Sequence, residues 1–137
     1  MNNGQIVFPV PDIIPDVVAS LLAGTGTAPA GSLIPFPTLA GVLFWGICEN
    51  AIANAEVVAL GVNKHYLVAK AAGAGTALAV GDYVTIAVVA GQSYGEVNKA
   101  GAGETIFGIV LTAANDAATQ VHILGPFMSA GGNYKTL

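Results

Sequence analysis

The amino-acid sequence predicts a mainly β fold, a small sandwich or barrel with at most one or two short helices. Short runs of β-branched and aromatic residues recur along the second part of the chain, and glycine, asparagine and serine separate them. Glycine also interrupts nearly every window long enough for a helix of ten residues. The expected strands are residues 57–62, 66–69, 83–90, 105–111 and 120–124.

Two alanine-rich stretches, residues 52–60 and 112–119, compete with this strand prediction. Alanine is the strongest helix former, so one short helix is allowed in one of them. A further short helix is expected over residues 16–23, with Asp16 as its N-cap and Gly24 after its end. The fold prediction therefore stays mainly β with minor helix.

The first forty residues differ from the rest and predict an extended, proline-rich amino-terminal arm, residues 1–40, ahead of one β-rich body, residues 41–137. Six of the seven prolines lie in this arm among apolar residues. Proline fixes φ and drives the preceding residue toward extended conformations. Extended apolar residues bury little surface against one another, so the arm needs a receiving surface, either its own body or a neighbouring subunit. The residues expected to make this contact are Ile6, Val7, Phe8, Pro9, Ile13, Ile14 and Phe36.

The composition indicates a subunit that buries area against partners. Hydrophobic residues make up 54% of the chain and charged residues 9%, against about 25% charged residues in an average soluble domain. The net charge of -4 and the absence of arginine argue against direct binding to nucleic acid. No apolar run approaches the roughly 18 residues of a membrane-spanning helix, and we expect neither a targeting segment nor membrane binding.

Residues that could carry chemistry are few. Cys48 is the only cysteine, which excludes an intramolecular disulfide, and its neighbours offer no positive charge to activate the thiol. His65 and His122 are the only histidines, and the sequence shows no ligand set or nucleophile-base pair around them. We therefore expect no enzyme activity and no catalytic, metal or cofactor site.

Residues 49–125 contain a glycine-aspartate turn before a strand, a strand with a central glycine, and a last strand that ends at glycine. These motifs are Ala79-Val80-Gly81-Asp82-Tyr83-Val84, Ile106-Phe107-Gly108-Ile109-Val110-Leu111 and Val121-His122-Ile123-Leu124-Gly125. With them the segment resembles the capsid decoration proteins of tailed bacteriophages, also called cement or head-stabilising proteins. The resemblance implies a β-tulip-like or Greek-key barrel with an amino-terminal arm on the shell. The long apolar arm of this chain departs from the shortest members of that type.

The resemblance further implies a homotrimer that binds the major capsid protein and strengthens the phage head against internal DNA pressure. It places the protein on the outer surface of the capsid, in virions assembled in the host cytoplasm. Together with the low charge and the apolar arm, this predicts a non-enzymatic capsid decoration subunit. The alternatives are another virion component (a head-fibre base, a minor capsid protein or a tail-tube protein) or a small cellular binding module.

Overall fold

The computed structural model describes residues 13–19, 21–22, 26–37, 43–62, 64–89 and 91–126. These residues form eleven β-strands and contain no helix. The strands are β1 (Ile13–Val18), β2 (Thr27–Ala28), β3 (Leu33–Pro37), β4 (Leu43–Ile47), β5 (Ile52–Ala53), β6 (Val57–Gly61), β7 (His65–Ala69), β8 (Tyr83–Val88), β9 (Gly95–Lys99), β10 (Gly108–Val110) and β11 (Gln120–Leu124). The prediction of a mainly β fold is confirmed.

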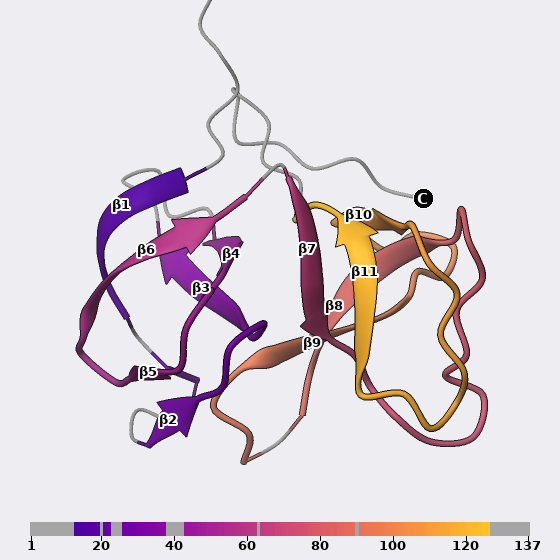
Figure 1. The fold of residues 1–137 in the computed structure, drawn as a ribbon, viewed down its shortest axis with the longest axis horizontal. Helices are drawn as coiled ribbons and strands as arrows, with labels where there is room; N and C mark the ends of the chain where they lie inside the picture. The colour runs from indigo at the N-terminus through magenta and orange to yellow at the C-terminus, as the bar shows by residue number, and fades with distance from the viewer. Residues whose placement is uncertain are drawn as a thin grey trace, which may run out of the picture.

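Nine strands form one antiparallel sheet in the order β1-β6-β4-β3-β9-β8-β10-β11-β7, and β2 pairs with β5 beside it. Figure 1 shows the sheet divided into two halves, with β1, β6, β4 and β3 in one and β8, β10, β11 and β7 in the other. The second half curls until β7 returns to β9, where Lys70 and Val97 form a parallel bridge and the Ala71 N–H donates to the Val97 carbonyl at 3.1 Å. The first half ends in β1, which pairs with β6 alone among the described residues.

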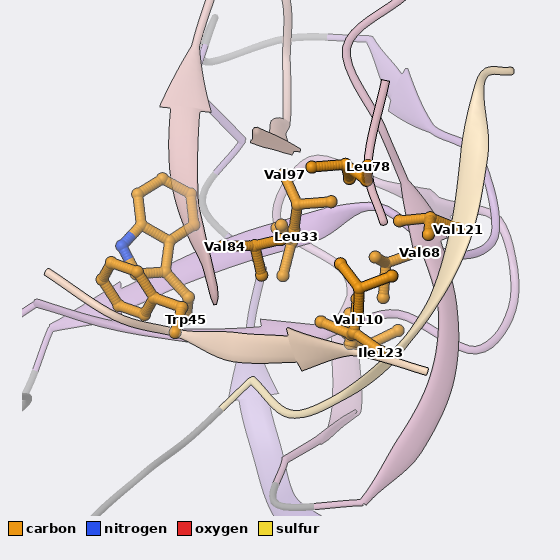
Figure 2. Packing of buried hydrophobic residues seen from close by; sticks show 11 residues of the cluster. Leu33, Trp45, Val68, Leu78, Val84, Val97, Val110, Val121 and Ile123 are labelled. Carbon is orange, nitrogen blue, oxygen red and sulfur yellow. The ribbon is translucent and has the colours of Figure 1, made fainter. Parts of the chain in front are cut away.

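Strands β3 and β4 form a wall between two apolar cores. Leu33 and Ile34 are adjacent and both fully buried, because successive side chains of a strand point to opposite faces. The first core, shown in Figure 2, consists of Leu33, Trp45, Ile47, Val68, Leu78, Val84, Val97, Phe107, Val110, Val121 and Ile123. The second core consists of Ala19, Leu21, Ala28, Ile34, Cys48, Ile52 and Leu60. Burial on both faces explains why this hairpin reads as continuous apolar sequence.

The helix expected over residues 16–23 is wrong. Asp16 lies inside β1, and the strand pairs with β6 from Ile13 opposite Gly61 to Val18 opposite Val57. The β-branched valines at this strand's end favour extended backbone, and Val17 packs against the second core. The short helix allowed at residues 52–60 or 112–119 is also absent, because β5 and β6 occupy the first stretch and irregular turns the second.

The part of the predicted arm that the structure describes belongs to the chain's own sheet. β1 pairs with β6, and β3 pairs with β4 along its length and with β9 at Leu33. Of the two receiving surfaces considered above, residues 13–18 and 33–37 therefore use their own body. Residues 1–12 lie outside the described residues.

Candidate interaction surface

The first exposed apolar surface lies on β1 and β6 at the free edge of the sheet. Val18 and Val57 face each other across the strand pair and are 62% and 63% exposed. The register shifts between Ile14 and Val17, so a bulge interrupts the edge next to Pro15. A proline and a bulge both limit further strand pairing along an edge, which leaves the exposed valines as the main feature for contact.

The second exposed apolar surface, here called the outer face, lies on β7, β11, β10 and β8. Register partners across these strands run from Tyr83 through Ile109 and Leu124 to His65, which places the four side chains on one side of the sheet. The large exposed apolar residues of the outer face are Leu67, Tyr83, Leu111 and Leu124. A contiguous apolar surface of this kind on a protein is typical of a contact with another macromolecule.

A stacked pair of histidines lies within the outer face. The rings of His65 and His122 are 5.1 Å apart between centroids and 17° from parallel. The Nδ1 atom of His122 is buried and has no hydrogen-bond partner among the described residues. Among the residues that the structure describes, no group of three or more histidine, cysteine, aspartate or glutamate side chains is placed to hold a metal ion. The pair therefore contributes flat, weakly polar area to the outer face.

A row of adjoining surface hollows is here called the seam groove; two of them lie between the two halves of the sheet, and the third lies on the first half, against residues 48–59. It consists of three hollows of about 310, 260 and 240 Å³. The central hollow shares Ala30 and Gln120 with one neighbour and Cys48 and Glu49 with the other. The central hollow is lined by Ala30, Gly31, Ile47, Cys48, Glu49, Tyr66, Leu67 and Gln120.

Carboxylates lie along the whole seam groove. Glu49 borders two hollows, while Glu56 and Glu96 line the outer two. Glu56 accepts a hydrogen bond from the Ala53 N–H at 2.8 Å, and Glu96 accepts one from the Gln92 side chain at 2.8 Å. Glu49 is exposed and makes no hydrogen bond or ion pair with the residues that the structure describes. The groove thus offers apolar walls and one carboxylate available to a cation.

The buried polar groups beside the groove serve packing. The Lys70 ammonium group donates to the carbonyls of Ala71 and Ala118 and to the Thr76 hydroxyl, so all three of its N–H bonds have acceptors. The Cys48 thiol donates to the Pro29 carbonyl at 3.2 Å, and burial raises its pKa above that of a free cysteine. The Lys70 amine is hydrogen-bonded through all its N–H groups, and the raised pKa of the Cys48 thiol favours the unreactive thiol over the thiolate. Both side chains therefore have a structural role.

The residues predicted for partner contact are only partly placed. Ile13 is half exposed and Ile14 is half-buried, both within β1, and Phe36 pairs with Phe44 between β3 and β4. Ile6, Val7, Phe8 and Pro9 lie outside the described residues. Sequence reasoning missed the outer face, although alternation places His65, Leu67 and Ala69 on one side of their strand, as it places Gln120, His122 and Leu124 on theirs.

The described residues contain no helix long and apolar enough to cross a membrane. Comparison of the chain with protein-family models, with curated proteins and with solved structures found no match.

Proposed function

We propose that the chain is a structural subunit of a virus particle, a decoration or cement protein that binds the lattice of major capsid protein on the outside of a phage head. The single observation that supports this best is the outer face, where large apolar side chains are exposed on β7, β8 and β11 and directly after β10. A protein with 9% charged residues and such a surface has the properties of a subunit that works in an assembly.

The free edge of the sheet adds a second reason. Residues 1–12 directly precede β1 in the sequence, and they contain the apolar run Ile6-Val7-Phe8-Pro9-Val10. An extended apolar segment binds well in pockets or along strands of another chain, since backbone hydrogen bonds and side-chain burial both contribute. In this proposal the segment lies on the shell, and the curled strands β9, β8, β10, β11 and β7 form the compact barrel that carries it.

Self-association into a homotrimer is part of the same proposal. The β1 and β6 valines and the outer face are two separate apolar surfaces, so one is available to a second copy while the other contacts the shell. The proposed role needs no catalytic step. Repetition of weak contacts over a lattice gives strong overall binding through avidity.

Removal of residues 1–12 tests this proposal. The cut stops before Ile13, because a longer deletion would remove residues of β1 that pair with β6. We expect the truncated protein to keep its thermal unfolding midpoint and to lose cosedimentation with undecorated capsid shells of the virus that carries the gene. Light scattering of the full chain in solution measures its mass, which we expect to be three times that of one chain. Equal shell binding by the full chain and the truncated chain would overturn the role of this segment, and no binding by either would overturn the decoration role.

A further inference from the structure

The seam groove has the shape and charge of a binding site for an extended peptide segment. Its central hollow of about 310 Å³ has apolar walls from Ile47, Tyr66 and Leu67. Glu49 stands at its margin, without a partner among the described residues. A suitable occupant therefore carries a large apolar or aromatic side chain next to a cation.

The carboxyl-terminal segment, residues 127–137, matches this requirement. It contains Tyr134 followed directly by Lys135, and a Gly131-Gly132 pair ahead of them permits a turn. The amino-terminal segment, residues 1–12, has no lysine or arginine and ends in an aspartate. Charge complementarity to Glu49 therefore favours the carboxyl-terminal segment over the amino-terminal one.

The remaining lysines of the chain do not compete for Glu49. Lys70 is buried and hydrogen-bonded to three acceptors, and Lys99 forms an ion pair with Asp82 at 3.2 Å. Lys64 makes an interaction of its own. Lys135 is thus the lysine of this chain that fits the position.

The distances allow docking within one molecule. The Gly125 N–H donates to the Lys64 carbonyl at 2.7 Å, so the end of the described chain lies beside the start of β7. Leu67 of the central hollow is three residues farther along, or about 10 Å at the rise of a strand. The eight residues from 127 to 134 span about 26–29 Å when extended, which exceeds this distance even with a turn.

We propose that residues 127–137 dock in the seam groove of the same polypeptide, with Tyr134 in the central hollow and Lys135 beside Glu49. This proposal is independent of the capsid role, and either one stands if the other fails.

Site-specific photo-crosslinking in the full chain tests the contact. Benzoylphenylalanine in place of Tyr134 should crosslink to peptides that contain Ile47, Tyr66 or Leu67, and the crosslinked product should migrate as a monomer. Crosslinks found only between two chains would overturn docking within one molecule. Crosslinks at positions away from the groove, or none, would overturn the groove as the site.

Charge reversal separates a specific contact from simple proximity. Lys135→Glu and Glu49→Lys should each lower the groove crosslink about two- to fivefold, the range expected of a partly exposed ion pair. The double variant Lys135→Glu/Glu49→Lys should restore most of the yield. Val80→Lys is the matched control, because Val80 is 66% exposed and does not line the groove. Reversals that leave the yield unchanged, or a control that lowers it equally, would overturn the pairing of Lys135 with Glu49.

Discussion

The two cores share the hairpin of β3 and β4, but the two halves of the sheet end differently. The first core is built largely from β-branched residues. It lies in the curled half, where the chain after β7 forms a bridge with β9 at Lys70 and Val97. The second core is smaller, includes two alanines and a cysteine, and lies under strands that end at the free edge of β1. The comparison teaches that, among the described residues, the main exposed apolar surface of the curled half is a sheet face, whereas the open half exposes the β1 edge, which twelve residues precede in the sequence.

The largest expected effects come from adjacent substitutions that each open one core. Leu33→Ala empties space in the first core and Ile34→Ala in the second, and both side chains are fully buried. Each should lower the free energy of unfolding by about 2–5 kcal/mol, measured by chemical denaturation. Because both residues lie on the shared hairpin, each variant should unfold in one cooperative transition.

Amide hydrogen exchange sharpens this comparison. Ile34→Ala should raise exchange in β1 and β6 more than in β10 and β11, and Leu33→Ala should give the opposite pattern. Two separate unfolding transitions in either variant would show that the two halves fold independently. That result would contradict the expectation that the β3–β4 hairpin couples the two cores.

The sequence predicted the curled half better than the open one for a physical reason. Strands β7, β8 and β11 of the curled half combine β-branched or aromatic residues with clear turns on either side, so local preference and final structure agree. Strand β9 was missed because Gly95, Glu96 and Asn98 have weak strand preference. Burial of Val97 and five register pairs with β8 hold it in place.

The open half depends on contacts between residues distant in sequence. In β1, pairing with β6 and packing against the second core prevail over the N-cap signal at Asp16. In β3, the register with β9 includes only Leu33, so Pro35 and Pro37 fall where a missing N–H costs no ladder bond to β9. Neither the pairing of β1 with β6 nor the short register of β3 with β9 can be predicted from the neighbouring residues in the sequence.

The candidate surfaces were still harder to predict. On β7, Leu67 is exposed while its neighbour Val68 is fully buried, yet both are apolar and β-compatible. Alternation groups residues by face, but only the path of the whole sheet decides which face meets the core. The same holds for the seam groove, whose residues come from segments on both sides of the seam.

The next largest expected effect is on stability, and it comes from replacing the buried Lys70, with the exposed Lys99 as the comparison. Lys70→Met keeps the side-chain stem but leaves the Ala71 and Ala118 carbonyls and the Thr76 hydroxyl without their donor. We expect a loss of about 1–3 kcal/mol in the free energy of unfolding, because partly buried acceptor groups would lose a charged donor. Lys99→Met is the control; its ammonium group is well exposed, and loss of its pair with Asp82 should cost at most about 1 kcal/mol. Equal losses would show that the Lys70 hydrogen bonds do not hold the loops of the curled half.

The smallest expected effect depends on pH and concerns the turn that leads into β8. The Ala79 N–H donates to the Asp82 carboxylate at 2.8 Å, and this bond, with Lys99 nearby, lowers the pKa of Asp82 below that of a free aspartate. A carboxylate with a lowered pKa in the folded state stabilises the protein above the unfolded-state pKa of about 4, and that contribution disappears as the pH falls through the folded-state value.

Asp82→Asn isolates the charge, since the amide oxygen of asparagine also accepts the Ala79 N–H. We expect the variant to be less stable than the original by about 1 kcal/mol or less at pH 7, and the difference to shrink as the pH falls below about 4. Urea denaturation of both proteins at pH 7 and pH 3 measures the change. A difference that grows in acid would reverse the sign and rule out Asp82 as the stabilising carboxylate. Because Gly81 in this turn also donates to the Val110 carbonyl at 2.9 Å, the acid-induced loss should loosen the β8–β10 side of the curled half and leave β1 and β6 unchanged.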